Sequence, residues 1–216
     1  MKRLGLTALL GLLANTAACV PNLGRTNARL EDGVDFAVSA GPAFVAPGEG
    51  TNSNADETHF WAQFEVDLQY AKQKENQSGF AIQVKMPLTF VFTTLDAYLE
   101  LPSRHPHYYG VGVEVGLVTG AYGAYSYYFT KNGYVTITPR IHVYLGGLNN
   151  STDSESRIWI NPQVAMGFIS PSGLVDTSIF FGYNRLLGKG VDFCIYDCDT
   201  TDFRNQFYLA GAQLRF

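Results

Sequence analysis

Apolar and polar residues alternate with a period of two along most of the chain, the pattern of β-strands whose two faces meet different surroundings. From His59 to Tyr70, for example, an apolar side chain occupies every second position, and most of the positions between them are polar. No segment after the N-terminal leader shows the 3.6-residue period of a helix, so the pattern predicts an all-β chain. We expect eight strands, at 34–41, 59–70, 80–90, 108–130, 135–145, 157–168, 175–184 and 207–216.

Short and long connections alternate between these strands. The short ones are Lys74–Gly79, Thr130–Gly133 and Ser170–Gly173, and the long polar ones are "VAPGEGTNSNADET", "DAYLELPSRHPH", "GGLNNSTDSES" and "LLGKGVDFCIYDCDTTD". Short turns at one end and long loops at the other are typical of transmembrane barrels. Segment 108–130 counts as one strand because two would break this alternation. The prediction is therefore a closed antiparallel up-and-down transmembrane β-barrel of eight strands, with ten strands as the alternative.

The period of two does not reveal which face lines the interior. In a soluble barrel such as a lipocalin the apolar face lines a ligand cavity, whereas in a membrane barrel it meets lipid. Here the apolar face is almost free of charge, and aromatic residues gather toward the strand ends, as they do in the interfacial girdles of membrane barrels. The Gly-x-Trp pattern of lipocalins is missing near the first strand. These features favour the membrane barrel.

The chain ends "FYLAGAQLRF", with Tyr208, Leu214 and Phe216 on the apolar face of the last strand. A terminal phenylalanine with apolar residues at alternate positions before it resembles the C-terminal signature of Gram-negative outer-membrane barrels, which their insertion machinery reads. The chain thus resembles the small outer-membrane barrels of the OmpA-like superfamily. The resemblance implies an outer-membrane location with the loops outside the cell and both termini in the periplasm. It also implies membrane lipid, lipopolysaccharide and the insertion machinery as partners.

The first residues have the anatomy of an export signal. A basic start and an apolar run too short to span a bilayer precede "TAAC" at 16–19. This tetrapeptide resembles the lipobox of bacterial lipoproteins, with Thr16 in place of the usual leucine, which implies lipidation of Cys19. Ordinary cleavage after Ala18 is the alternative. We expect a signal peptide at 1–18, a periplasmic lead-in and lipid tether at 19–32, and the barrel at 33–216. Cys194 and Cys198 are close enough in sequence to pair in an oxidising compartment.

Composition limits the class of protein and the class of partner. Charged residues make up 16 % of the chain, against about 25 % in a typical soluble protein. A net charge of −4 argues against nucleic acid as a partner.

An eight-stranded barrel is just wide enough for side chains to fill, so inward charges should pair and plug it. A narrow polar path near Glu65, Asp67, Lys85 and Arg140 is the alternative. The expected interior charges are Asp35, Glu65, Asp67, Lys85, Glu114, Arg140, Arg157 and Asp176.

Candidate chemistry is sparse. Ser103, His105 and His107 share one expected external loop, where they could form a catalytic group with Glu100 as the orienting acid or hold a metal ion. A solvated loop is the preferred interpretation. Asp192, Asp197, Asp199 and Asp202 surround the cysteine pair without ordered ligand spacing, so we predict a disulfide-stapled loop and no metal. The sequence contains no cofactor motif, and we expect no cofactor.

The sequence therefore favours a non-enzymatic outer-membrane barrel with a plugged polar interior and a structural or surface-interaction role through its external loops. Three alternatives remain: an enzyme acting on outer-leaflet lipid, transport of small solutes through a narrow pore, and a lipocalin-like periplasmic lipoprotein that binds an apolar ligand.

Overall fold

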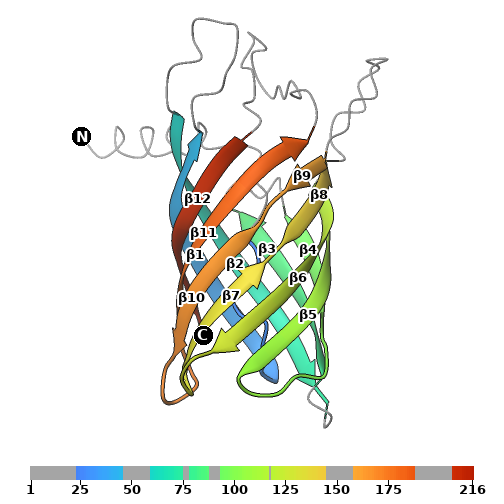
Figure 1. The fold of residues 1–216 in the computed structure, drawn as a ribbon, viewed down its shortest axis with the longest axis vertical. Helices are drawn as coiled ribbons and strands as arrows, with labels where there is room; N and C mark the ends of the chain where they lie inside the picture. Colours follow the sequence, from blue (N-terminus) through green and yellow to red (C-terminus); the bar gives the residue numbers. More distant parts are fainter. Residues whose placement is uncertain are drawn as a thin grey trace, which may run out of the picture.

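The computed structural model describes residues 23–45, 59–74, 78–87, 93–116, 118–144, 158–187 and 206–216. These residues form twelve strands in one antiparallel sheet (Figure 1). They are β1 (Gly33–Val45), β2 (His59–Gln73), β3 (Gly79–Pro87), β4 (Thr94–Glu100), β5 (His107–Val115), β6 (Val118–Tyr128), β7 (Gly133–Thr138), β8 (Arg140–Tyr144), β9 (Ile158–Ile160), β10 (Gln163–Ile169), β11 (Asp176–Leu187) and β12 (Gln206–Arg215).

The sheet closes on itself into a barrel. The last strand, β12, pairs with both β11 and β1, with Val38 of β1 opposite Leu214. Phe36 and Phe216 extend this seam, since the amide of each donates to the carbonyl of the other at 3.0 and 2.8 Å. The terminal strand thus completes the ring and leaves no open edge.

The twelve segments make a ring of ten strands. β7 and β8 both pair with β6 and are successive parts of one strand, interrupted at Pro139, which cannot donate to a ladder. β9 and β10 both pair with β11 and are interrupted in the same way next to Pro162. The expectation of eight strands is therefore wrong, and the alternative of ten is correct.

The two missed strands lie in one part of the chain. β4 lies in the first half of a stretch that we expected to be a long connection. Its charged and aromatic residues line the barrel interior, and in the sequence they resembled a polar loop. The segment from Tyr108 to Thr130 contains both β5 and β6, which meet in a hairpin next to Gly116. The strands still run alternately up and down, but connection length no longer alternates, because the two-residue connection between β5 and β6 lies at the same end as the long connections.

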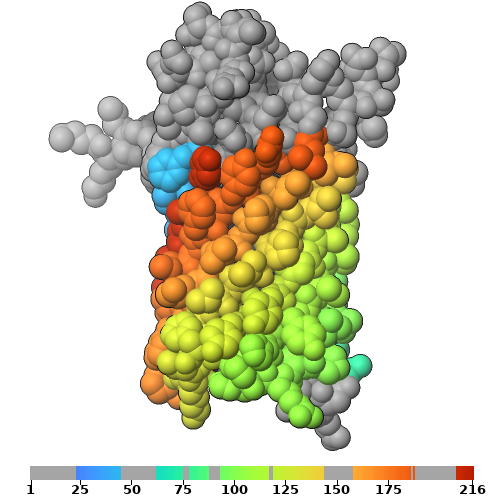
Figure 2. Space-filling view, in the orientation of Figure 1, coloured from blue at the N-terminus to red at the C-terminus, as the bar shows by residue number. Residues whose placement is uncertain are grey.

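The outer face of the barrel is apolar and the inner face is polar. On β5, Val113 is 50 % exposed, whereas its neighbour Glu114 is 1 % exposed. The same division runs round the ring, and Figure 2 shows that side chains cover the visible side of the wall without a break between strands. Among the described residues, no helix is long and apolar enough to cross a bilayer. A polar interior contradicts the lipocalin-like alternative, and an apolar exterior requires lipid around it.

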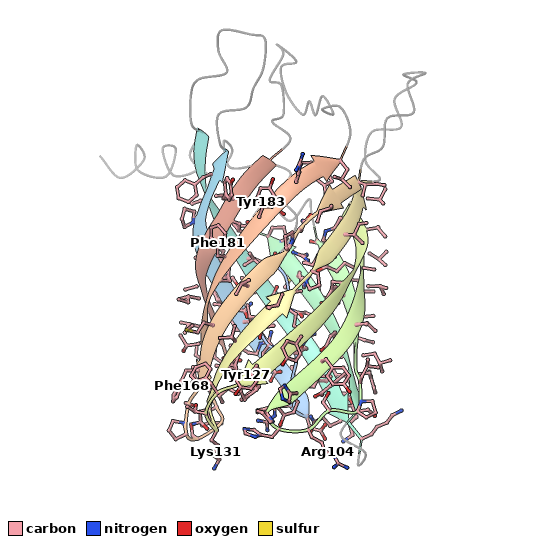
Figure 3. All side chains as sticks on the ribbon, in the orientation of Figure 1. Arg104, Tyr127, Lys131, Phe168, Phe181 and Tyr183 are labelled. Atoms are coloured by element: carbon pink, nitrogen blue, oxygen red, sulfur yellow. The ribbon has the colours of Figure 1, made fainter. Side chains whose placement is uncertain are left out.

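The two ends of the barrel differ. Connections 74–78, 101–106, 129–132 and 170–175 lie at one end, the short-turn end, where Phe216 also lies. Figure 3 shows Arg104 and Lys131 at this end and Phe181 and Tyr183 toward the other. The segment containing Ser103 and His105 is consequently a short turn, and its expected place among the long external loops is wrong.

Candidate functional site

A stretch of chain lies inside the barrel. Residues 23–30, which we call the interior segment, precede β1 and are buried among the inward side chains, apart from half-buried Arg29. Their backbone amides donate to side chains of the wall: Leu23 to Glu65 Oε2 at 3.2 Å, Gly24 to Gln163 Oε1 at 2.8 Å, Ala28 to Ser126 Oγ at 2.8 Å and Leu30 to Glu100 Oε2 at 3.1 Å. With further contacts from Lys85, Thr138 and Gln213, these hydrogen bonds come from seven strands.

The interior segment runs toward the short-turn end. It starts beside Lys85, whose Nζ donates to the Leu23 carbonyl at 3.0 Å, and ends where Gln73 donates to the Leu30 carbonyl at 2.6 Å. Asp32 then meets the rim, where it accepts hydrogen bonds from the Gln73 amide and from Lys72 Nζ. These bonds, led by the backbone one, lower the pKa of Asp32. Much of the stretch that the sequence assigned to a lead-in thus lies within the barrel.

Arg25 is the fully buried charged residue of the interior segment. Its guanidinium carbon lies 4.0 Å from the centre of the Tyr98 ring, and Nη2 donates to Gln69 Oε1 at 2.8 Å. Nε lies 3.5 Å from the hydroxyl of Tyr122, which itself donates to Asp96 Oδ1 at 2.7 Å. The side chain is 2 % exposed. A cation–π contact, an amide oxygen and a nearby carboxylate together hold the guanidinium.

The two tyrosines depend on a glycine between them. Gly112 on β5 is the cross-strand partner of Tyr98 on one side and of Tyr122 on the other. The two rings lie over it, with centres 6.0 Å apart and planes 4° from parallel. A Cβ at Gly112 would lie 2.3 Å from Tyr122 Cζ. The absence of a side chain therefore lets both rings lie flat across β5 beneath Arg25.

We predict that Gly112→Ala destabilises the barrel by about 1–3 kcal/mol, because the new methyl group displaces the Tyr122 ring from a packed interior. The measurement is the midpoint temperature of heating at which the protein loses the gel mobility of the folded, unboiled barrel. Gly123→Ala is the matched control, since a Cβ there meets no atom nearer than 3.9 Å. Equal midpoints for the two variants would contradict the role of Gly112.

A second group of interior side chains forms an ion network around Glu114. Arg140 Nη2 lies 2.7 Å from Glu114 Oε2, and Lys85 Nζ and His142 Nε2 also bind this carboxylate. Lys85 additionally lies 3.2 Å from Asp96 Oδ2. All five side chains are at most 5 % exposed. Strands β3, β4, β5 and β8 are thus joined through buried charges that offset one another.

The structure brings together most of the charges expected inside. Glu65, Asp67, Lys85, Glu114 and Arg140 are buried in the interior. Asp35 and Asp176 are half-buried on the same face, where they accept hydrogen bonds from Gln69 Nε2 at 3.0 Å and from the Tyr134 hydroxyl at 2.7 Å. Arg157 lies outside the described residues.

Sequence reasoning missed Asp96, Tyr98, His142 and Arg25 as interior groups. Asp96 and Tyr98 alternate with Leu95 and Leu99 on β4, and this period of two could have identified them. His142 occupies one of the alternate polar positions of its expected strand. No local pattern marks Arg25, since its partners lie 44 to 97 residues away along the chain.

The candidate catalytic residues do not assemble within the described part of the chain. Ser103 Oγ donates to the Leu101 carbonyl at 2.6 Å, and His107 Nδ1 lies 2.7 Å from the Tyr125 hydroxyl. The His105 ring lies near Tyr128, with centres 6.2 Å apart. Glu100, expected to orient a histidine, instead binds the amide of Leu30. These side chains anchor a turn and the interior segment.

Other expected sites fall partly outside the described residues. Within the described ranges, no group of three His, Cys, Asp or Glu side chains could hold a metal ion. Leu214 and Phe216 are exposed on the apolar face, and half-buried Tyr208 shares their parity. Outside the described ranges lie Cys19, Cys194, Cys198, Asp192, Asp197, Asp199 and Asp202.

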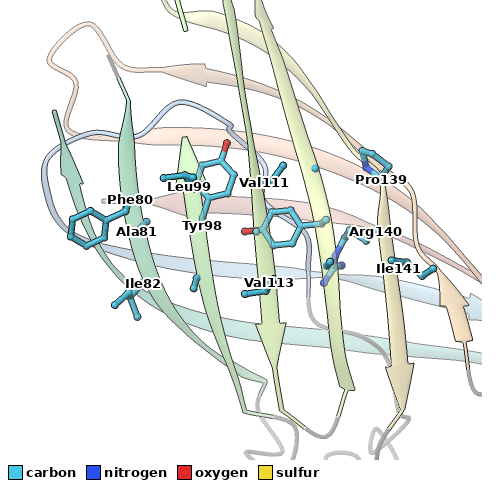
Figure 4. Close-up of a pocket in the computed structure, with 15 residues that line it drawn as sticks. Phe80, Ala81, Ile82, Tyr98, Leu99, Val111, Val113, Pro139, Arg140 and Ile141 are labelled. Carbon is cyan, nitrogen blue, oxygen red and sulfur yellow. The ribbon is translucent and has the colours of Figure 1, made fainter. Parts of the chain in front are cut away.

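A wide groove of about 900 Å³ lies over β3 to β6 and β8 (Figure 4). Most of its lining side chains, among them Ile82, Leu99 and Val113, belong to the outward apolar face. The groove is therefore mainly a feature of the outer surface, although its lining also includes Tyr98, Gly112, Tyr122 and Arg140 of the interior groups described above.

The architecture is shared with solved outer-membrane proteins. No protein-family profile matches the chain, and no curated protein sequence matches it. An outer membrane channel from Pseudomonas putida F1 aligns with a TM-score of 0.55 and 12 % identity over 89 % of this chain and 99 % of that one. Neisserial surface protein A aligns with a TM-score of 0.39 and 14 % identity over 84 % and 95 % of the two chains. Ail from Yersinia pestis aligns with a TM-score of 0.35 and 10 % identity over 84 % and 99 %. The chain has the fold of Gram-negative outer-membrane β-barrels.

Proposed function

We propose that the protein is an outer-membrane channel held closed by its own interior segment. The observation that carries the proposal is the position of residues 23–30, which lie in a polar lumen and bind side chains from seven strands. Plugged lumens occur among larger outer-membrane transporters. The P. putida protein of similar fold is described as a channel, which is consistent with this assignment.

Barrel width supports a removable plug. The diameter of a barrel grows with strand number, and side chains alone fill an eight-stranded one. A ten-stranded ring has additional room, and here one extended peptide takes it up. Withdrawal of that peptide would leave a polar path along the barrel axis.

The chemistry of the contacts also supports displacement. The hydrogen-bond partners of the interior segment are carboxylates, amides, hydroxyls and an ammonium, all of which can bind water instead, while Leu23, Ala28 and Leu30 pack against apolar side chains of the wall. A typical hydrogen bond contributes only about 0.5–1.5 kcal/mol net, because water replaces the partner that leaves. The polar contacts therefore oppose withdrawal of the segment only weakly, and the apolar packing of Leu23, Ala28 and Leu30 is the larger cost of displacement.

The wall charges favour cations in the open state. Among the described inward residues, carboxylates outnumber cationic groups: Asp35, Glu65, Asp67, Asp96, Glu100, Glu114 and Asp176 against Lys85, Arg140 and Arg215. Arg25 of the interior segment offsets part of this excess in the closed state. Rings of acidic side chains select cations in pores.

The test is single-channel recording in planar bilayers. We expect no conductance from the full chain and a steady, cation-preferring current from a variant lacking residues 23–30, because the deletion removes the plug and its arginine. Reversal potentials in a salt gradient measure the preference. Arg29→Ala, which removes a half-buried side chain near the end of the segment, is the control and should stay closed.

The deletion variant must first be shown to fold, by its altered gel mobility before boiling. A folded deletion variant that carries no current would contradict the channel and leave a barrel with a structural role. Current from the full chain at rest would contradict the plug.

Location and surface role belong to the same proposal. We place the barrel in the outer membrane with the short-turn end in the periplasm and the long connections outside, and with the terminal strand carrying the insertion signal. Lipidation at Cys19, the Cys194–Cys198 disulfide and a surface-interaction role of the long connections involve residues outside the described ranges. They stay predictions, testable by mass spectrometry of the purified protein and by protease accessibility on intact cells.

A further inference from the structure

We propose that the barrel wall carries a binding site for guanidinium cations, and that Arg25 occupies it as an internal substitute for a permeating solute. The inference rests on the proposed function, because the site opens to solutes when the interior segment withdraws. Its elements are Gln69 on β2, Gln83 on β3, Tyr98 on β4 and Tyr122 on β6.

The site is built mainly by the wall. Tyr98 is held in place by its parallel stack with Tyr122 over Gly112. Gln69 is oriented by its own amide nitrogen, which donates to Asp35 Oδ2 at 3.0 Å and so turns the amide oxygen toward Arg25. The Tyr122 hydroxyl is fixed by Asp96. These restraints come from other strands, and the Tyr98 hydroxyl also donates to the Ala28 carbonyl at 2.8 Å, a bond that Arg25→Ala retains. We therefore expect the site to persist in that variant, and a preorganised site binds at a lower entropic cost.

The geometry fits a guanidinium better than an ammonium. A planar, weakly hydrated cation lies against the Tyr98 face at 4.0 Å while its edge donates to the Gln69 oxygen at 2.8 Å. A guanidinium can stack and donate in its own plane at once, whereas an ammonium is a compact, strongly hydrated point charge. The solute class is therefore a small molecule with a guanidinium group, such as arginine or an alkylguanidine.

The net charge of the surroundings agrees with a cationic occupant. Asp96 lies behind Tyr122, and the carboxylates of Glu65 and Asp67 face the same lumen. Lys85 offsets Asp96 only in part, because it also binds Glu114. Removing Arg25 thus leaves the site with an unbalanced negative field.

The experiment uses the full chain with Arg25→Ala, folded in detergent, and methylguanidinium as the probe. We expect 10 mM methylguanidinium to raise the temperature at which this variant loses its folded gel mobility, and to leave the wild-type temperature unchanged because Arg25 fills the site. Methylammonium at the same concentration should give no such rise. Titration calorimetry should show at least tenfold tighter binding of methylguanidinium than of methylammonium.

A second variant identifies the site. In Arg25→Ala with Tyr98→Leu, the effect of methylguanidinium should vanish while the effect of salt alone stays the same. Equal effects of the two cations, or no effect on a folded Arg25→Ala barrel, would overturn the guanidinium site.

Conductance measurements distinguish the guanidinium site from the proposed channel. Methylguanidinium should block the current of the variant lacking residues 23–30 more strongly than methylammonium does. Binding to Arg25→Ala without any current from the deletion variant would support the site and contradict the channel. An open deletion variant with no binding and no selective block would support the channel and contradict the site.

Discussion

Glu114→Ala is expected to lower the free energy of unfolding of the barrel by about 3–5 kcal/mol, the cost of removing one partner from a buried ion network. The carboxylate binds Arg140 through both of its oxygens, at 3.0 and 2.7 Å, and also contacts Lys85 and His142. The substitution takes this carboxylate away from the buried Arg140 guanidinium, while Lys85 keeps its ion pair with Asp96 at 3.2 Å.

The size of the effect follows from burial. Glu114 is 1 % exposed, so its cationic neighbours cannot regain full hydration when it is removed. Urea titration of the barrel in lipid vesicles measures the change directly. Glu31→Ala is the matched control: this glutamate lies 3.7 Å from Arg29 with about half of its side chain exposed, and such surface pairs contribute about 0–1 kcal/mol.

Glu114→Gln refines the result. The amide keeps the shape and one acceptor oxygen but loses the charge, so its effect should lie between those of the wild type and Glu114→Ala. If Glu114→Ala and Glu31→Ala changed the unfolding free energy by the same amount, the interior would be hydrated enough to screen the network, and the buried ion pairs would contribute no more than surface ones.

The fold was largely predictable because one physical rule dominates the wall. A side chain on a barrel strand meets either lipid or the lumen, so the period of two appears in the sequence wherever a strand crosses. The rule failed at β4, where Asp96, Tyr98 and Glu100 made an inward face resemble a polar loop. It failed again at Gly116, where two strands turn so tightly that their alternating patterns run together.

The site was less predictable, because pairing depends on register and register is not a local property. Parity alone identified Glu114 and Arg140 as inward residues. Their contact depends on how β5, β6 and β8 align, with Glu114 opposite Gly120 and Gly120 opposite His142. Glycine at 120 opens the space through which these side chains meet, since a Cβ there would lie 2.3 Å from the His142 ring.

The interior segment gave no periodic signal at all. Half of its residues are polar, and it lies close to the expected signal peptide, so a tether was the natural interpretation. Only the closed ring creates the lumen that accepts Arg25, and the groups that bind it come from four strands. Conversely, the proximity of Ser103 and His105 in sequence suggested chemistry that their contacts do not support.

Val113→Arg tests the outward face at the position next to Glu114. Val113 is 50 % exposed and stands four residues beyond Tyr109, an aromatic residue near the short-turn end, so we place it near the middle of the apolar band. An arginine facing lipid at that depth costs about 2–4 kcal/mol. We expect a matching loss in unfolding free energy in vesicles and a smaller folded fraction in the outer membrane.

The control for this variant is Val113→Leu, which stays apolar and should change the unfolding free energy by less than about 1.5 kcal/mol. Two neighbouring residues are then expected to show opposite effects. Adding a charge at position 113 lowers the unfolding free energy, and removing the charge at position 114 lowers it as well. A soluble barrel would give a different outcome, because its exposed face accepts arginine at little cost. Unchanged stability of Val113→Arg, together with release of the protein from membranes by carbonate, would therefore contradict the membrane-spanning barrel on which the channel proposal depends.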